Sequence, residues 1–197
     1  MPTSAKKSWR RSPDDDSGSA SDFTSFSQSH MPRILGIDPG SRITGYGVLD
    51  IRANKIIYVA SGCVRSTEET FPERLKQIFT GISQVATTYQ PDSLAIEQVF
   101  MHKNADSALK LGQARGAAIC AGVANNLPVF EYPARVVKKA IVGKGAADKI
   151  QVRHMVKYLL QISGSLQIDA SDALAIALCH CHQQQASQQL HLRLAHS

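Results

Sequence analysis

Residues 33–65 read RILGIDPGSRITGYGVLDIRANKIIYVASGCVR, and this stretch decides the fold. Short apolar runs alternate in it with turn-forming residues, which is typical of consecutive β-strands. Pro39 and Gly40 supply the first turn, because proline presets its backbone angle and glycine accepts a positive φ. The predicted strands are Arg33–Asp38, Gly45–Ile51 and Ile56–Arg65. Their short connections indicate an antiparallel meander.

The rest of the chain mixes helical and strand patterns. Arg74–Tyr89 has apolar residues at helical spacing, and Pro72 stands near its start, where proline is tolerated. The other predicted elements are strands over Ser93–Gln98 and Val129–Tyr132, and helices over Asp106–Asn125, Ala134–Val142, Asp148–Ile162 and Asp169–Gln185. This order predicts an α/β fold with a mixed five-stranded sheet flanked by helices.

Composition separates an N-terminal leader from the domain. Residues 1–30 contain nine serines and no apolar periodicity, so we expect a disordered extension. One domain is expected over residues 31–185, followed by a flexible tail over 186–197. No apolar run is long enough to span a membrane, and four cysteines without a secretory signal indicate reduced thiols in a cytoplasmic protein. The net charge of +6 favours a polyanionic partner.

Four acidic residues stand where they can converge on one site. Asp38 and Glu97 each end a predicted core strand, and Asp169 and Asp172 share a face at a helix start. Converging carboxylates need cations, and hard oxygen ligands select Mg²⁺ or Mn²⁺. Two such ions can activate water and stabilise the leaving oxygen in phosphodiester cleavage. The alternatives are that Asp38 is a turn residue, Asp169 a helix cap and Asp172 a first-turn charge.

Three segments resemble the RuvC family of bacterial Holliday junction resolvases. They are Ile34–Asp50 (ILGIDPGSRITGYGVLD), Ala95–Gly116 (AIEQVFMHKNADSALKLGQARG) and Asp169–Ala177 (DASDALAIA). The resemblance covers residues 31–182 and implies a ribonuclease H-like fold in a homodimer.

The activity that the resemblance implies is a Mg²⁺-dependent endonuclease of recombination and DNA repair, which nicks two opposed strands of a four-way DNA junction symmetrically. The family's catalytic, metal-holding acids match Asp38, Glu97, Asp169 and Asp172, and some relatives have histidine at the position of Asp169. Two ions per site are expected, and Mn²⁺ can substitute. The implied partner is the RuvA–RuvB branch-migration complex.

DNA contacts are predicted in the stretch between Glu97 and the final aspartate pair, Asp169 and Asp172. Residues 99–153 contain nine Lys or Arg against three Asp or Glu, and such clusters bind phosphates. The resemblance implicates Lys138 and Lys149, and we add Lys139 and Lys144. Phe100 is predicted to stack on an unpaired base at the junction centre. The alternatives are that many of these cations solvate helix faces and that Phe100 lies in the core.

Gly112 and Gly116 form a small-residue face on the helix predicted over Asp106–Asn125. The family's dimer uses this helix region, and the alternative is that the glycines pack on the chain's own sheet. Cys63 and Cys120 are predicted to be core residues.

Parts of the sequence also suggest a zinc site, a nucleotide-phosphate loop or a non-catalytic DNA-binding protein. The segment 179–182, Cys-His-Cys-His, is rejected as a zinc site, since consecutive helical residues point about 100° apart. Asp38-Pro39-Gly40-Ser41 also resembles the phosphate loop of actin-like ATPases and sugar kinases, which need a far longer chain. A catalytically silent junction-binding protein is disfavoured by the four intact acids.

Overall fold

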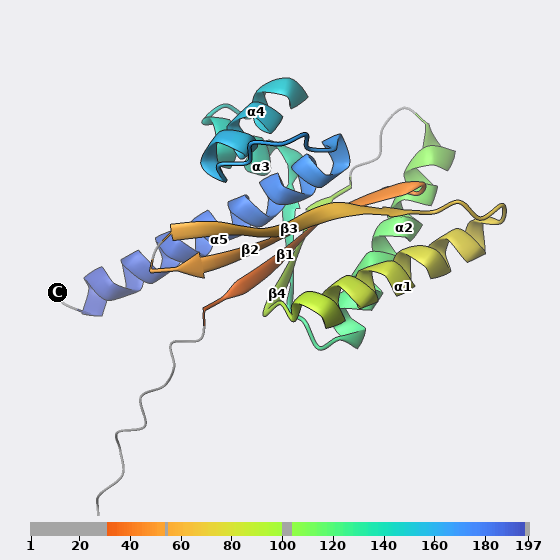
Figure 1. The fold of residues 1–197 in the computed structure, drawn as a ribbon, viewed down its shortest axis with the longest axis horizontal. Coiled ribbons are helices and arrows are strands. Elements are labelled where there is room, and N and C mark those ends of the chain that lie inside the picture. Colours follow the sequence, from red (N-terminus) through yellow and green to blue (C-terminus); the bar gives the residue numbers. More distant parts are fainter. Residues whose placement is uncertain (1–30, 54, 100–103, 196–197) are drawn as a thin grey trace, which may run out of the picture. The chain divides into compact units, whose positions relative to one another are not determined.

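The computed structural model describes residues 31–53, 55–99 and 104–195 (Figure 1). Its elements are β1 (Arg33–Asp38), β2 (Ile43–Arg52), β3 (Lys55–Arg65), α1 (Phe71–Tyr89), β4 (Ser93–Gln98), α2 (Ala105–Ala124), β5 (Val129–Pro133), α3 (Ala134–Val142), α4 (Lys149–Leu159) and α5 (Ile168–Ala195). The predicted α/β fold and the type of each predicted element are confirmed. The prediction for residues 1–30 lies outside the described residues.

The five strands form one mixed sheet in the order β3-β2-β1-β4-β5. β1, β2 and β3 pair antiparallel, as the meander predicted. β1 and β4 pair parallel, with Ile37 opposite Ile96, and β4 and β5 also pair parallel. The carboxyl ends of β1, β4 and β5 therefore meet at one edge of the sheet, where α/β proteins place their ligand sites.

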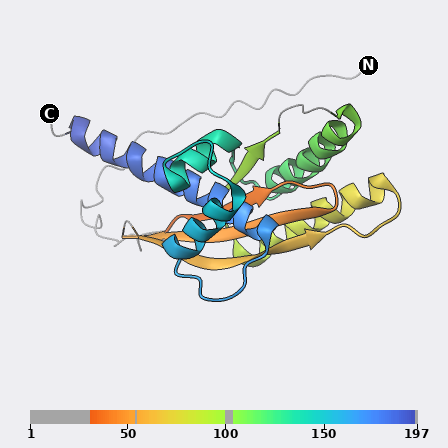
Figure 2. The same ribbon diagram turned by 90° about the horizontal axis from the view of Figure 1, so that it is seen from above.

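Helices cover both faces of the sheet. Ile34 of β1 and Ala95 of β4 belong to a core with α3, α4 and α5, whereas Leu35 and Ile96 belong to a core with α1 and α2. This alternation follows from the two-residue period of a strand. Figures 1 and 2 show the same grouping, with α3 and α4 beside α5 and with α1 running along α2.

Two glycines let α5 approach the sheet closely. A Cβ atom on Gly36 of β1 would lie 2.2 Å from the backbone oxygen of Ala173, and one on Gly45 of β2 would lie 2.0 Å from that of Asp169. Any side chain at either position would collide with the helix backbone. The glycines thus set the first turns of α5 directly against the ends of β1 and β2.

The last helix is longer than predicted. We expected it to end at Gln185 and residues 186–197 to form a flexible tail, but α5 continues to Ala195. Residues 186–195 contain neither glycine nor proline and are rich in glutamine, leucine and alanine, which favour helices. The expected tail is therefore corrected to helix over 186–195. None of the described helices is long and apolar enough to cross a membrane.

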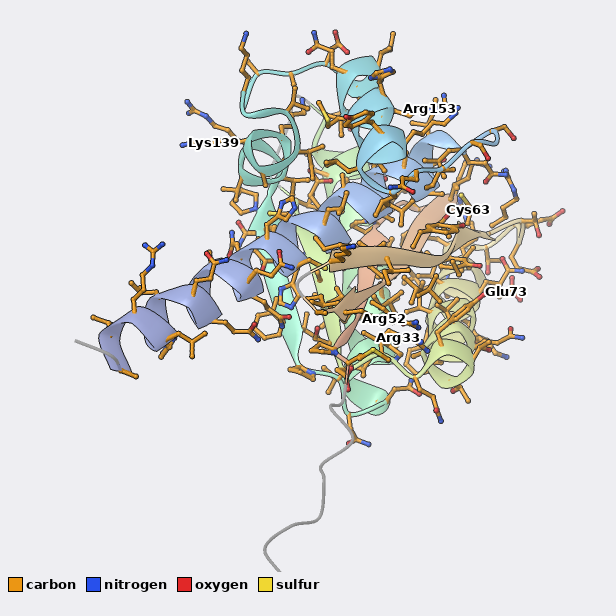
Figure 3. All side chains as sticks on the ribbon, turned by 60° about the vertical axis from the view of Figure 1, so that its left-hand side comes forward. Arg33, Arg52, Cys63, Glu73, Lys139 and Arg153 are labelled. Atoms are coloured by element: carbon orange, nitrogen blue, oxygen red, sulfur yellow. The ribbon has the colours of Figure 1, made fainter. Side chains whose placement is uncertain are left out.

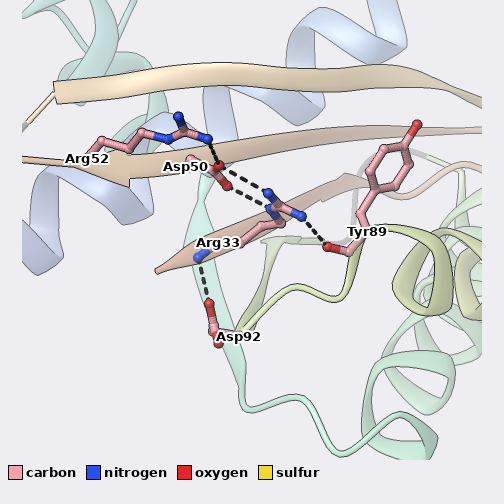
Figure 4. A network of polar contacts seen from close by, with 5 residues as sticks. All are labelled: Arg33, Asp50, Arg52, Tyr89 and Asp92. Atoms are coloured by element: carbon pink, nitrogen blue, oxygen red, sulfur yellow. Dashed lines mark hydrogen bonds and ion pairs between the residues drawn. The ribbon is translucent and has the colours of Figure 1, made fainter. Parts of the chain in front are cut away.

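A buried ion pair fixes the amino end of β1 (Figure 4). Arg33 Nε and Nη2 donate to the two carboxylate oxygens of Asp50 at 2.7 and 3.1 Å, and the Asp50 side chain is 2% exposed. Arg52 reaches the same carboxylate at 3.2 Å. Arg33 also donates to the backbone oxygen of Tyr89, and its amide to Asp92. The network ties β1, β2 and the α1–β4 connection together at the end opposite to Asp38.

Asp50→Asn is expected to lower the free energy of unfolding by about 3 kcal/mol, because it leaves a half-buried guanidinium without its counter-charge. The hydrogen bond from Arg33 lowers the pKa of Asp50 in the folded state. The contribution is therefore present above the ordinary aspartate pKa and is lost as the pH falls through the lowered one. Urea unfolding of wild type and variant between pH 2 and 7 measures this.

The matched control for Asp50→Asn is Asp106→Asn, which removes an exposed carboxylate that pairs with Lys110 on the next turn of its own helix. A loss of stability that is equal in both variants, or that does not shrink towards low pH, would contradict the prediction.

Candidate active site

A cleft of about 190 Å³ opens at the edge of the sheet where β1 and β4 end. Its polar side chains are Asp38, Glu97, Asp172, Lys138 and Lys149. Its apolar wall comes from α3, α4 and α5 and consists of Ala134, Val137, Val152, Ala175 and Ile176. The cleft thus brings together three of the four predicted acids and two of the predicted lysines.

Strand alternation aims the first two acids into this cleft. Leu35 and Ile37 of β1, and likewise Leu94 and Ile96 of β4, pack on the side of α1 and α2. The residue after each run therefore faces α5. Because Ile37 and Ile96 are register partners, the next residues, Asp38 and Glu97, stand side by side.

Burial and mutual repulsion raise the pKa values of these carboxyls. The pKa of Asp38 rises to about 8, mainly through burial and then through the charges of Asp172 and Glu97. The pKa of Glu97 is also raised, by burial first and by Asp172 next. An added positive charge nearby would stabilise the ionised forms of both carboxyl groups.

Two lysines supply part of that positive charge. Lys149, the first residue of α4, places its Nζ 3.1 Å from Oδ2 of Asp172. Its pKa is raised by this hydrogen bond and by the charges of Asp172, Asp38 and Glu97. Lys138 of α3 lines the same cleft and lowers the pKa of Glu97. The cleft therefore sets three carboxylates, from β1, β4 and α5, against two lysines from α3 and α4.

Asp169 lies one helical turn before Asp172 but outside the lining of the cleft. Its charge is the last-ranked cause of the raised pKa of Asp38 and the second-ranked cause, after burial, of the raised pKa of Cys63. Its backbone oxygen faces Gly45. The structure therefore separates the aspartate pair, with Asp172 in the cleft and Asp169 beside β2 and β3.

The other predicted DNA contacts fall into three groups. Lys144 lines a neighbouring groove of about 570 Å³ together with Arg135 and Lys138. Lys139 lies on the outward side of α3 (Figure 3) and lines neither cavity. Phe100 lies outside the described residues.

The chemistry of the cleft suits a hard divalent cation. Its donors are carboxylate oxygens, which Mg²⁺ and Mn²⁺ prefer, and the pKa values of Asp38 and Glu97 are raised by burial and then by neighbouring acids. In the described part of the chain no three Asp, Glu, His or Cys side chains lie close enough together to hold one ion. The type of donor fits the ion, and in this arrangement Asp172 is paired with Lys149.

The Cys-His-Cys-His segment of α5 lies in the core. Cys179, His180 and Cys181 are buried. Nδ1 of His180 lies 2.6 Å from Tyr132 Oη, and its Nε2 lies near Ser93 and Gln184. Burial lowers the pKa of His180 to about 4, so this ring is neutral at physiological pH. Its ring nitrogens form hydrogen bonds that link α5 to β4 and β5.

The helix α2 presents its glycine pair to the outside. Cβ atoms added to Gly112 and Gly116 would meet no atom within 4 Å, so packing of these glycines on the chain's own sheet is excluded. Cys120 is exposed on the same helix, and its predicted place in the core was wrong. The buried face of α2 consists instead of Ala114, Ala118, Ala121 and Gly122.

Sequence reasoning missed Arg115 as a site residue, because it treated Arg115 only as one of the nine Lys or Arg residues in the stretch 99–153. In the structure it donates a hydrogen bond to the backbone oxygen of Glu97 and pairs with Glu131 of β5. A signal was present, since Arg115 is the single charged residue between Leu111 and Ala124. A lone charge on an otherwise small and apolar helix indicates a specific partner.

Comparison with known proteins finds one family over most of the chain. The model described as "Crossover junction endodeoxyribonuclease RuvC" matches residues 34–180. The protein of that name from Methylococcus capsulatus is 64% identical over 155 residues, which are 79% of this chain and 93% of that relative. The one from Pectobacterium atrosepticum is 61% identical over 152 residues, covering 77% and 89%.

Solved structures agree with the sequence comparison. Thermus thermophilus RuvC in complex with a Holliday junction substrate has a TM-score of 0.73 and 32% identity, and covers 80% of this chain and 97% of that one. A yeast mitochondrial Holliday junction resolvase, 13% identical, shares the fold with a TM-score of 0.56, covering 78% and 79%. The predicted ribonuclease H-like fold is thereby confirmed.

Proposed function

Because the chain belongs to the RuvC family of crossover junction endodeoxyribonucleases, which are metal-dependent nucleases, we propose that its cleft cuts four-way DNA junctions by paired, symmetric nicks. The observation that carries this proposal is the convergence of Asp38, Glu97 and Asp172 at the carboxyl ends of β1 and β4. Four-way DNA junctions are intermediates of recombination and DNA repair.

The acids of the cleft would hold the divalent cation. Asp38 is proposed to hold both ions, Glu97 one of them and Asp172 the other, with Asp169 assisting Asp172 from one turn away. Mg²⁺ is the proposed ion, and Mn²⁺ would substitute, because both take carboxylate oxygens. Such ions make a water molecule more acidic and stabilise charge on the phosphate oxygens.

Among the described residues, the cleft offers no side chain for a covalent route through a hydroxyl, thiol or imidazole. None of the described residues lining the cleft is Ser, Thr, Tyr, Cys or His. Water is therefore the proposed nucleophile. Lys149 and Lys138 stand across from the acids and would orient the scissile phosphate by charge.

The basic groove beside the cleft gives the proposed path of the DNA backbone. Lys138 lines both cavities, and Arg135 and Lys144 continue the positive charge along α3 and the loop after it. Lys139, on the outer side of α3, is proposed to contact a more distant phosphate. Phe100, which follows the Glu97 strand, is still proposed to stack on an unpaired base, and RuvA–RuvB remains the proposed partner complex.

We infer that α2 forms the homodimer. A face along this helix carries Leu109, Gly112, Gly116, Cys120 and Val123, with Leu109 63% and Val123 59% exposed. Glycines allow two helix backbones to approach closely, and an apolar rim adds burial. A symmetric dimer places two clefts on a substrate that has twofold symmetry, which accounts for paired nicks.

Gly116→Leu is expected to convert the dimer into a monomer and to replace paired nicks by single, uncoupled ones. A Cβ at Gly116 meets nothing in the chain itself, so the subunit should stay folded. Light scattering after gel filtration measures the mass, and circular dichroism the fold. The control is Gly164→Leu, at a glycine whose added Cβ also meets open space. A Gly116→Leu protein that remains dimeric would refute this interface.

The proposed function is tested with a synthetic mobile four-way junction, labelled on each strand in turn. With Mg²⁺ or Mn²⁺ we expect symmetric nicks on two opposed strands, and with EDTA none. A linear duplex of the same sequence is the substrate control. Equal cutting of the duplex, or cutting that EDTA does not prevent, would overturn the proposal.

A further inference from the structure

Arg115 joins two strands at the edge of the cleft. Its Nε donates a hydrogen bond to the backbone oxygen of Glu97 at 2.9 Å, and its Nη2 lies 2.5 Å from Oε2 of Glu131. The Arg115 side chain is 19% exposed. A guanidinium is planar and rigid, so it holds two acceptors in a fixed relation, which a lysine cannot do.

Arg115 acts from the face of the sheet opposite to the cleft. Leu94 and Ile96 of β4 pack on the side of α2, so the Glu97 side chain points the other way, towards α5. Arg115 does not line the cleft. It holds the backbone of the residue whose carboxylate stands there.

Within the sheet, Glu97 is paired with a neighbouring strand on one side only among the described residues. The ladder between β1 and β4 ends at the pair Ile37–Ile96, whereas the ladder between β4 and β5 continues through Glu97 opposite Tyr132. The side of Glu97 towards β1 therefore lacks a register partner among the described residues. A tether from α2 to the Glu97 carbonyl restrains a strand end that would otherwise fray.

We propose that Arg115 is a positioning residue that fixes the end of β4 and so directs the Glu97 carboxylate into the cleft that Asp38 and Asp172 also line. This rests on the proposed function, in which Glu97 holds the metal ion. Arg115 contacts neither the ion nor the DNA and acts only through the backbone of Glu97 and the side chain of Glu131.

The test uses Arg115→Gln and Arg115→Lys in the full chain. Arg115→Gln is expected to lower the single-turnover cleavage rate at saturating protein about 30-fold, as the loss of a group that orients a metal ligand does. Mn²⁺ binding to the DNA-free protein, measured by calorimetry, should weaken about tenfold. Junction affinity in EDTA should stay within about twofold, since no phosphate contact is lost.

Two further variants separate positioning from general stability. Arg115→Lys keeps the charge near Glu131 but loses the second arm, so we expect wild-type melting with a cleavage rate still about tenfold lower. Glu131→Gln leaves Arg115 in place and should shift both readouts in the same direction, by less. Lys110→Gln removes a cation and an ion pair from the same helix, away from Glu97, and should change neither.

The outcomes are distinct. Wild-type cleavage and Mn²⁺ affinity in both Arg115 variants would overturn the proposal. Weaker junction binding with a shallower salt dependence, at an unchanged saturated rate, would make Arg115 a phosphate contact and would also overturn it. If the wild-type protein cuts no junction, the proposed function fails, whereas a lowered Mn²⁺ affinity in the variants still supports positioning.

Discussion

Asp38→Asn is expected to lower the rate of junction cleavage about 1000-fold or more while leaving junction binding intact. Loss of one preorganised charged group at a reacting centre has effects of this size. Asp38 lines the cleft together with Glu97 and Asp172, and its pKa is raised to about 8. An amide in its place would not supply the negative charge that holds a cation. Apart from Phe100, the DNA contacts that we propose come from α3, α4 and their connecting loop, and the substitution leaves all of these residues in place.

The same variant should be more stable than the wild type in the absence of metal. The folded-state pKa of Asp38, about 8, lies above the value of an unfolded chain, so the ionised group opposes folding. This destabilising contribution to the free energy of folding begins above the ordinary aspartate pKa and grows until the pH passes about 8. Asp38→Asn removes it, and the gain in melting temperature should therefore increase from pH 5 to pH 8.

Single-turnover cleavage, gel-shift binding in EDTA and calorimetric melting at three pH values measure these effects. Asp106→Asn, which loses an exposed carboxylate outside the cleft, serves as the control. A variant that is inactive and also less stable at every pH would indicate misfolding and would contradict the assignment of Asp38.

Gly45→Ala is expected to reduce cleavage about 100-fold and to lower the melting temperature. One methyl group at this position would stand 2.0 Å from the backbone oxygen of Asp169, so the first turn of α5 must move away from β2. Overpacking of this kind costs about 1–3 kcal/mol. A shift of about 1 Å in a catalytic group costs about 100-fold in rate.

Gly164→Ala is the matched control, because its added Cβ would meet no atom within 4 Å. Melting curves and cleavage rates of the two variants give the comparison. Full activity of Gly45→Ala would show that the position of α5 relative to β1 and β2 does not govern the site.

Much of the fold could be predicted because strand and helix periods are local properties. The runs around Ile34–Ile37 and Leu94–Ile96 mark buried strands by composition alone, and the acid at the end of each run is conspicuous. The β2 strand begins at Ile43, two residues before its predicted start, because the ladder with β3 extends to Arg65. Pairing partners, which set such ends, are not visible in one strand.

The remaining features depend on tertiary distances. Asp169 and Asp172 look equivalent in sequence, yet the packing of α5 against Gly36 and Gly45 puts one into the cleft and leaves the other beside β2. The two partners of Arg115 lie on different strands, so no local pattern could reveal them. Cys120 was predicted to be buried because cysteine usually is, whereas α2 turns it outwards.

The cleft takes one acid from the first strand of the domain and another from its last helix. These two elements are the first and the last of the domain to leave the ribosome. A nascent chain in which α5 has not yet been synthesised lacks Asp172, the part of the apolar wall formed by Ala175 and Ile176, and the helix that packs on Gly36 and Gly45. If these acids cleave DNA as we propose, the order of synthesis withholds nuclease activity until the domain is whole.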